Sequence, residues 1–257
     1  MLHTRRFGHG EPIVALHGFT LTGEQFAASA EPLNREVVAP DLPGHGNSAQ
    51  APADIDTVVK AVCDLTTSFP APVPMIGYSQ GGRIALLSTL ECRDSVSHLV
   101  LISANAGIDD DQTRRNRATQ DDALAARIEL IGSERFIDEW TAADLTSTAG
   151  MEPDERLHDR RVRLTNTPDG LAAALRGYGQ GVQPVVWRSL ERIDLPVLVV
   201  AGSRDAVYTE IAHRLHEHIA GSELVIVHDA GHNPVSYTHL TLPTTSALCR
   251  SRWARYH

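Results

Sequence analysis

The sequence has few of the features that mark membrane, secreted or nucleic-acid-binding proteins. Its 257 residues include three cysteines and one lysine, and no apolar run approaches the ~18–20 residues of a membrane span. The 23 basic and 32 acidic side chains give a net charge of −9, whereas nucleic-acid binders present a basic face. The N-terminal residues lack the apolar core of a signal peptide. We therefore expect a cytoplasmic protein that binds neither nucleic acid nor a membrane.

The scarcity of cysteine also argues against a thiol-based framework. Cys63, Cys92 and Cys249 are an odd number without a CxxC pair, so neither a disulfide framework nor a thiolate zinc site is expected. Cys63 and Cys92 lie in apolar helical patterns, which predicts buried free thiols. His213 and His216 share a helix face and could hold a metal, but a solvated face is the better interpretation. No metal and no other cofactor is expected.

Short apolar runs bounded by turn residues recur along the chain. They are rich in Val, Ile and Leu without alternation, as expected of strands covered on both faces, and they span residues 13–16, 36–40, 73–76, 98–102, 197–201 and 224–227. Helical patterns at 55–68, 82–92 and 208–219 lie between them. The alternation predicts an α/β fold with a mostly parallel central sheet and helices on both faces.

The alternation stops between Ile102 and Val197. A crossover needs only about a dozen residues, and this longer stretch carries helical patterns at 121–131, 133–145, 155–164 and 168–176. It predicts a helical cap inserted over one end of the sheet. We therefore assign residues 1–102 and 196–235 to the core, and residues 103–195 to the cap and its return helix.

The last residues of the chain depart from this pattern. No amphipathic helix can be drawn through residues 236–257, and Pro243 interrupts them. The string at 236–245 resembles translated sequencing-adapter read-through. We interpret 236–257 as a non-native tail, with a divergent native tail as the alternative.

A candidate nucleophile follows the third apolar run. Gly77-Tyr78-Ser79-Gln80-Gly81 lies between a predicted strand and a predicted helix, which is the context of the nucleophile elbow G-x-S-x-G. A serine needs a histidine and an orienting carboxylate to become reactive. Asp205 and His232 follow later strands at the same sheet edge, in the chain order that such triads take. The alternatives are a helix N-cap for Asp205 and a surface-loop histidine for His232.

A second turn supplies candidate donors for an oxyanion. His17-Gly18-Phe19 follows the first apolar run, where a turn can present a backbone N–H to a developing negative charge. The residue after the nucleophile supplies the other donor. The candidate oxyanion hole is therefore formed by the N–H groups of Phe19 and Gln80, whereas His17 is expected to be structural.

With these motifs the chain resembles the α/β-hydrolase fold family. Within that family it is similar to the 2-succinyl-6-hydroxy-2,4-cyclohexadiene-1-carboxylate synthases of menaquinone biosynthesis. The finer resemblance lies in residues 77–83 and in three stretches of the predicted cap, 114–125, 136–140 and 170–184. The chain departs from these synthases at Gln80, where they often have Met or Leu, and in lacking their closing helix.

The resemblance implies a lyase that eliminates pyruvate from 2-succinyl-5-enolpyruvyl-6-hydroxy-3-cyclohexene-1-carboxylate. In this scheme the base is Ser79, activated by His232 and Asp205. The positions that match substrate-binding residues of the family are Tyr78, Arg83, Arg117, Trp140 and Arg163. Arg161 is the alternative to Arg163. The expected partner is thus a small polycarboxylate, bound by a monomer or a weak homo-oligomer.

A serine hydrolase is the main alternative, either a carboxylesterase or a carbon–carbon bond hydrolase. It would use the same triad with Ser79 as the nucleophile. An esterase for neutral esters has little use for Arg83 and Arg117 at the site, so these arginines favour the lyase. A non-enzymatic ligand receptor is a third possibility, against which an intact triad argues.

Overall fold

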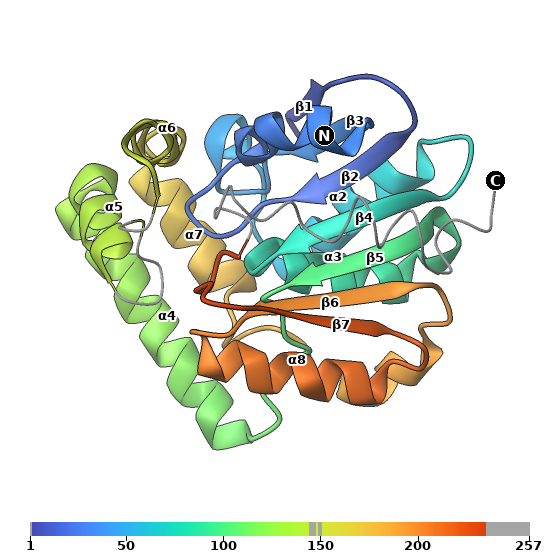
Figure 1. Cartoon of the computed structure of the whole chain (residues 1–257). Helices are drawn as coiled ribbons and strands as arrows, with labels where there is room; N and C mark the ends of the chain where they lie inside the picture. Colours follow the sequence, from blue (N-terminus) through green and yellow to red (C-terminus); the bar gives the residue numbers. More distant parts are fainter. Residues whose placement is uncertain (1, 144–147, 149–150, 235–257) are drawn as a thin grey trace.

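A computed structural model describes residues 2–143, 148 and 151–234 of the chain. Its described strands form one sheet of seven in the order β1-β3-β2-β4-β5-β6-β7 (Figure 1). They are β1 (Thr4–Phe7), β2 (Pro12–Leu16), β3 (Glu36–Pro40), β4 (Val73–Tyr78), β5 (Val96–Ile102), β6 (Val197–Gly202) and β7 (Glu223–Val227). Strand β1 pairs antiparallel with β3, and the other neighbours pair in parallel. The predicted α/β fold with a mostly parallel sheet is confirmed.

Strand β1 is the strand that the sequence did not predict. It consists of Thr-Arg-Arg-Phe, and its residues are half-buried or exposed. An edge strand needs no continuous apolar run because only one side of it pairs with the sheet, and charged side chains protect such an edge. The apolar runs identified the other six strands, whereas this strand contains no apolar run.

Helices cover both faces of the sheet. One face packs against α2 (Ile55–Thr67), α3 (Gln80–Glu91) and α8 (Ala206–His218) in the main core. On the opposite face, the short helices η1 (Gly23–Ser29) and α1 (Ala30–Leu33) cover the part formed by β2 and β3. Because β2 to β6 are largely buried, the carboxyl ends of these parallel strands are held at one rigid edge.

Four described α-helices follow β5 and precede β6 in the chain, and they lie at one end of the sheet (Figure 1). They are α4 (Asp111–Ile131), α5 (Ser133–Ala142), α6 (Pro153–Arg163) and α7 (Pro168–Tyr178), and η5 (Trp187–Arg192) leads back to the sheet. Their apolar side chains form a cluster of their own around Ile128, Phe136 and Leu171. We call α4–α7 the cap helices.

The structure extends one of the predicted cap helices. The pattern at 121–131 covers only the second half of α4, which begins at Asp111 with the Asp110 carboxylate capping the N–H of Thr113. The first half is largely exposed and polar. It therefore lacks the apolar periodicity by which a helix is recognised.

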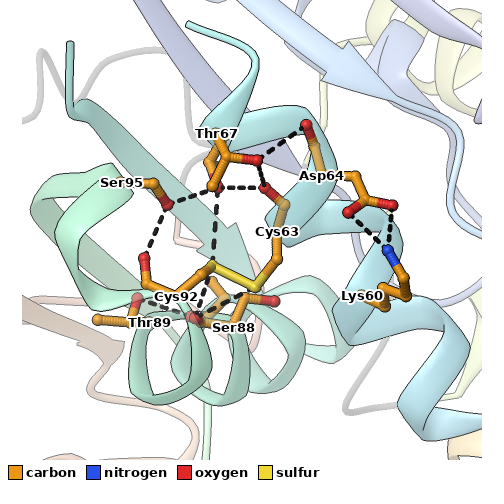
Figure 2. Close-up of a disulfide and its surroundings, with 10 residues drawn as sticks. Lys60, Cys63, Asp64, Thr67, Ser88, Thr89, Cys92 and Ser95 are labelled. Carbon is orange, nitrogen blue, oxygen red and sulfur yellow. Dashed lines mark hydrogen bonds and ion pairs between the residues drawn. A yellow bond between two sulfur atoms is a disulfide. The ribbon is translucent and has the colours of Figure 1, made fainter.

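The two cysteines of the core helices are joined, contrary to the prediction of free thiols. Figure 2 shows Cys63 on α2 bonded to Cys92 at the end of α3. Their Cα atoms are 5.8 Å apart, within the range that a disulfide can bridge. Sequence spacing gave no sign of this pair because its partners are 29 positions apart and meet only when α2 packs beside α3.

The prediction of a tail at residues 236–257 lies outside the described residues.

The close approach of α7 to the core can be tested by filling it. A Cβ atom at Gly177 would lie 1.4 Å from the carbonyl oxygen of Ala53. Because overpacking costs ~1–3 kcal/mol, we expect Gly177→Ala to lower the thermal midpoint by several degrees, at ~2–4 °C per kcal/mol. Ala173→Ser, at an exposed position of the same helix, is the matched control. Equal melting of the two variants would contradict the close packing of α7.

Candidate active site

Ser79 occupies the sharp turn between β4 and α3. Its backbone has φ 51° and ψ −110°, a left-handed conformation that non-glycine residues rarely adopt and that surrounding structure must maintain. Its N–H donates to the carbonyl oxygen of Ile102, 2.8 Å away. A Cβ atom at Gly81 would lie 2.2 Å from the carbonyl oxygen of Leu16. The glycine of the motif is therefore required because the elbow packs directly on the end of β2.

The structure brings the three residues of the candidate triad together. His232 Nε2 lies 2.9 Å from Ser79 Oγ, and His232 Nδ1 lies 2.7 Å from Asp205 Oδ2. A carboxylate at this distance accepts the proton of Nδ1, so the hydrogen-bond network places the lone pair of Nε2 toward the serine hydroxyl. Asp205 and His232 are both buried. This arrangement can remove a proton from Ser79.

Asp205 serves two functions that were considered as alternatives. Its Oδ1 accepts the N–H of Tyr208, 3.1 Å away, at the start of α8, while its Oδ2 contacts His232. The helix cap fixes the carboxylate in position, and the second oxygen orients the imidazole. The N-cap interpretation and the triad interpretation are therefore both correct descriptions of its contacts.

Two tyrosine rings flank the imidazole of His232. The ring of Tyr208 lies 4.5 Å from that of His232 in an edge-to-face arrangement, and the ring of Tyr78 lies 5.7 Å away. Burial raises the pKa of both tyrosines. Both side chains therefore remain neutral phenols at physiological pH, and they restrict the ring of His232 sterically without adding charge.

The turn after β2 lies against the nucleophile. A Cβ atom at Gly18 would meet the ring of Tyr78 at 2.7 Å and Cβ of Ser79 at 3.6 Å, so the neighbouring backbone is close to the reacting atom. Within residues 2–143, 148 and 151–234, the N–H groups of Phe19 and Gln80 have no hydrogen-bond acceptor. Gln80 begins α3, where unpaired N–H groups and the helix dipole favour negative charge.

His17 is structural in its contacts, as its position suggested. Its Nε2 accepts the N–H of Leu42 at 2.9 Å, and its Nδ1 lies 2.9 Å from the carbonyl oxygen of Gly18. Burial lowers the pKa of His17 to about 4, and burial with the nearby His17 lowers that of His45 to about 3. Both rings are therefore neutral at physiological pH, and they brace the turns that surround Phe19.

Arg83 is a buried cation in the first turn of α3. Its side chain is 4% exposed, and its Nη1 donates to the carbonyl oxygen of Tyr178 at 3.2 Å and to Gln183 Oε1 at 3.1 Å. Both acceptors are neutral. In the described part of the chain, no acceptor contacts its Nε and Nη2 groups, and these form the edge that binds a carboxylate with two parallel bonds.

Arg163 illustrates the same edge in use. Its Nε and Nη2 bind the two oxygens of Asp159 at 2.6 Å and 3.0 Å, and its Nη1 donates to the hydroxyl of Thr20. The side chain of Arg163 is buried, whereas Arg161 is exposed. The inward-facing arginine of this helix is therefore Arg163, and Arg161 faces away from the interior. The positive charge of Arg163 is balanced by the carboxylate of Asp159.

Arg117 reaches the site from the cap helix α4. Its Nε donates to Asp121 Oδ1 at 2.7 Å, and its Nη1 donates to Gln180 Oε1 at 3.1 Å. Trp140, from α5, lies edge-on to the ring of Phe19 at 5.4 Å. The cap helices therefore place an aromatic ring beside Phe19 and a cation beside Gln180, whose amide contacts Tyr208.

Sequence reasoning did not identify the residues that hold these arginines. Asp121 and Asp159 lie four positions from Arg117 and Arg163 on the same helices, a spacing that could have revealed them. Gln180 and Gln183 had no such signal because they contact residues far away in the sequence.

Among the described residues there is no cluster of three metal-ligating side chains, and no described helix is long and apolar enough to cross a membrane.

Comparisons with known proteins agree with this geometry. A model of the alpha/beta hydrolase family matches residues 13–240. A Bacillus subtilis (strain 168) protein named as a candidate 2-succinyl-6-hydroxy-2,4-cyclohexadiene-1-carboxylate synthase is 35% identical over 86% of this chain and 84% of its own length. The Klebsiella pneumoniae enzyme of that name is 28% identical over 91% of this chain and 92% of its own. The structure of MenH from S. aureus superposes with a TM-score of 0.87 and 27% identity over 93% of this chain and 94% of that one.

The neutral burial of His17 and His45 predicts how stability depends on pH. Both have a lower pKa in the folded chain, about 4 and about 3, than the ~6.5 of an unfolded chain. Between these values the unfolded state binds more protons, so stability is full above pH ~6.5 and is lost as the pH falls. Urea unfolding should show a loss of roughly 2 kcal/mol for each histidine between pH 7 and pH 5. An unchanged unfolding free energy would contradict their neutral burial.

The orienting role of Asp205 predicts a second outcome. Asp205→Asn can still cap α8 through its carbonyl oxygen, but its amide would donate to His232 Nδ1 and move the ring proton to Nε2. We expect the rate of Ser79 labelling by a fluorophosphonate to fall by about 10³–10⁴-fold with little change in thermal midpoint. Asp229→Asn, at an exposed neighbouring carboxylate, is the control. Equal labelling of both variants would contradict the triad.

Proposed function

The chain belongs to the α/β-hydrolase family, and from this membership we propose that it is a carbon–oxygen lyase of menaquinone biosynthesis. It eliminates pyruvate from 2-succinyl-5-enolpyruvyl-6-hydroxy-3-cyclohexene-1-carboxylate. The names of its relatives support this activity. The observation that carries the proposal is the carboxylate-binding edge of the buried Arg83, which has no acceptor among the described residues.

A buried cation of this kind is informative because it is costly. Burial of a charge without an opposite charge in contact with it destabilises the folded protein by several kcal/mol, and burial lowers the pKa of Arg83 although the nearby charge of Asp121 opposes that shift. Arg117 and Arg163 are each paired with an aspartate, whereas the acceptors that contact Arg83 among the described residues are neutral. An anionic substrate supplies the charge that Arg83 lacks, and it makes the binding of a carboxylate favourable here.

In the proposed mechanism the triad acts as a base. His232, held by Asp205, takes the proton of Ser79, so that the serine oxygen can remove a proton next to a substrate carbonyl. The N–H groups of Phe19 and Gln80 stabilise the enolate that develops. Collapse of the substrate enolate breaks the bond between the ring carbon and the enolpyruvyl oxygen, and the enolate of pyruvate that leaves takes up a proton, which His232 can return, to give pyruvate. Positioned base catalysis contributes ~10²–10⁴-fold, and removal of one oxyanion donor typically costs roughly 10²–10³-fold.

Carboxylate binding positions the substrate for this step. Arg83 lies one turn beyond Ser79 on α3 and offers a bidentate edge. Arg117 and Arg163 retain unused N–H groups beside their aspartate partners. Tyr78 and Trp140 complete the proposed lining. A small polycarboxylate partner, a cytoplasmic location and a monomeric or weakly associating state stay predictions.

A serine hydrolase would use the same triad with Ser79 as the nucleophile. The geometry of Ser79, His232 and Asp205 serves both reactions equally well. The arginines separate the two functions because a neutral ester gains nothing from the free edge of Arg83. The proposal therefore favours the lyase on the charge of the substrate that the site can accept.

The experiment follows pyruvate release from the proposed substrate by the wild-type protein and two variants. Ser79→Ala should abolish turnover and keep the thermal midpoint, because the elbow accommodates a smaller side chain. Arg83→Ala should lower kcat/KM by about 10–100-fold, since a charge-assisted hydrogen bond contributes ~1.5–3 kcal/mol. Arg115→Ala, at an exposed arginine of α4, is the matched control.

Cleavage of p-nitrophenyl acetate is measured in parallel. Ester cleavage without pyruvate release would contradict the lyase and favour the hydrolase. Pyruvate release that is equally fast in Arg83→Ala and Arg115→Ala would leave the lyase in place and remove the role proposed for Arg83.

A further inference from the structure

We propose that Gln180 is a positioning residue that orients the guanidinium of Arg117 for carboxylate binding. Through Tyr208, whose ring packs on His232, Gln180 also connects Arg117 to the triad. The inference rests on the proposed binding of a substrate carboxylate by Arg117. Gln180 lies in the turn that follows α7, and its amide contacts both residues at once. Its Oε1 accepts Arg117 Nη1 at 3.1 Å, and its Nε2 donates to the hydroxyl of Tyr208 at 2.8 Å.

The guanidinium of Arg117 is held at two of its three nitrogens. Asp121 Oδ1 binds Nε at 2.7 Å, and Gln180 binds Nη1. The other oxygen of Asp121 accepts the N–H of Gly181 at 3.0 Å. Arg117, Asp121, Gly181 and Gln180 therefore form a closed ring of contacts. Within the described part of the chain only Nη2 lacks an acceptor, so this nitrogen is the one presented to a ligand.

Tyr208 extends the ring to the catalytic residues. Its hydroxyl accepts from Gln180 Nε2. Its ring packs on His232 with 4.5 Å between centroids, and its N–H is capped by Asp205. The amide of Gln180 is thus oriented by a residue that is itself fixed against the triad. The position of the Arg117 guanidinium relative to His232 is therefore fixed through Gln180 and Tyr208.

An amide is suited to this role by its chemistry. Arg117 offers only donors, so its partner must accept. Tyr208 remains a neutral phenol because burial raises its pKa, and its oxygen can accept. Glutamine supplies one acceptor and one donor on a single group without adding charge. A glutamate in its place would bind Arg117 more strongly but would neutralise it and lose the donor toward Tyr208.

The test measures how well succinate protects Ser79 from labelling by a fluorophosphonate, which requires no turnover. Compared with the wild type, Gln180→Met keeps the volume of the side chain and removes both hydrogen bonds. Because one hydrogen bond contributes ~0.5–1.5 kcal/mol, we expect the protecting concentration of succinate to rise about fivefold. Gln180→Glu should raise it further, since its carboxylate competes with succinate for Arg117.

A double-mutant cycle shows whether Gln180 acts through Arg117. In an Arg117→Ala background, Gln180→Met should weaken protection less than twofold, because the group that it positions is absent. Gln112→Met, at an exposed glutamine of α4, is the control for the chemical change. Thermal midpoints of all variants are compared, so that a loss of fold is recognised.

Several results would overturn the inference. One is an equal loss of protection from Gln180→Met with and without Arg117. Another is protection in Gln180→Glu at least as strong as in the wild type, which is the result expected if Gln180 only stabilises the fold. Absence of any protection in the wild type also overturns it, since Arg117 would then bind no carboxylate at the site. Pyruvate release by the wild type, measured separately, reports on the proposed function alone.

Discussion

The backbone of Ser79 must turn from β4 into α3 within one residue, and the rest of the site is arranged around that turn. Ser79 has a positive φ of 51°, a conformation that costs of order 1–3 kcal/mol and persists only where neighbouring structure imposes it. The end of β2 packs against Gly81, and the carbonyl oxygen of Ile102 on β5 accepts the serine N–H. These contacts with the parallel sheet offset the cost of the turn. The turn places the serine hydroxyl at the edge of the sheet from which the loops carrying Asp205 and His232 also emerge.

Charge balance distinguishes this site from a general serine hydrolase site. Two of the three inward arginines are paired with aspartates four positions away on their own helices. Arg83 contacts neutral oxygens instead, and it lies on the helix that begins at the nucleophile. The catalytic serine and the buried Arg83 are therefore held by the same helix, α3. In the proposed function, this connection lets an acidic protein select an anionic substrate.

The sequence predicted the parts of the molecule that have local signatures. The buried strands were recognised by their apolar runs, and the elbow was recognised by its glycine motif. Asp205 and His232 were recognised because they follow the ends of predicted strands. Strand β1 and the first half of α4 were not predicted because they are largely polar and are not fully buried. The Cys63–Cys92 bond and the contacts of Gln180 escaped because they depend on the packing of helices far apart in the chain. Arg163 and Arg161 could be separated only once the inward face of α6 was known.

The central claim is that Ser79 acts as a base and not as a nucleophile. It is tested most directly by the intact mass of the protein, quenched during steady-state turnover while pyruvate accumulates. A base removes and returns a proton, so the account predicts an unchanged mass throughout turnover. A mass increase on Ser79 that appears with substrate and decays when substrate is exhausted would contradict it, because only a nucleophile forms such an intermediate.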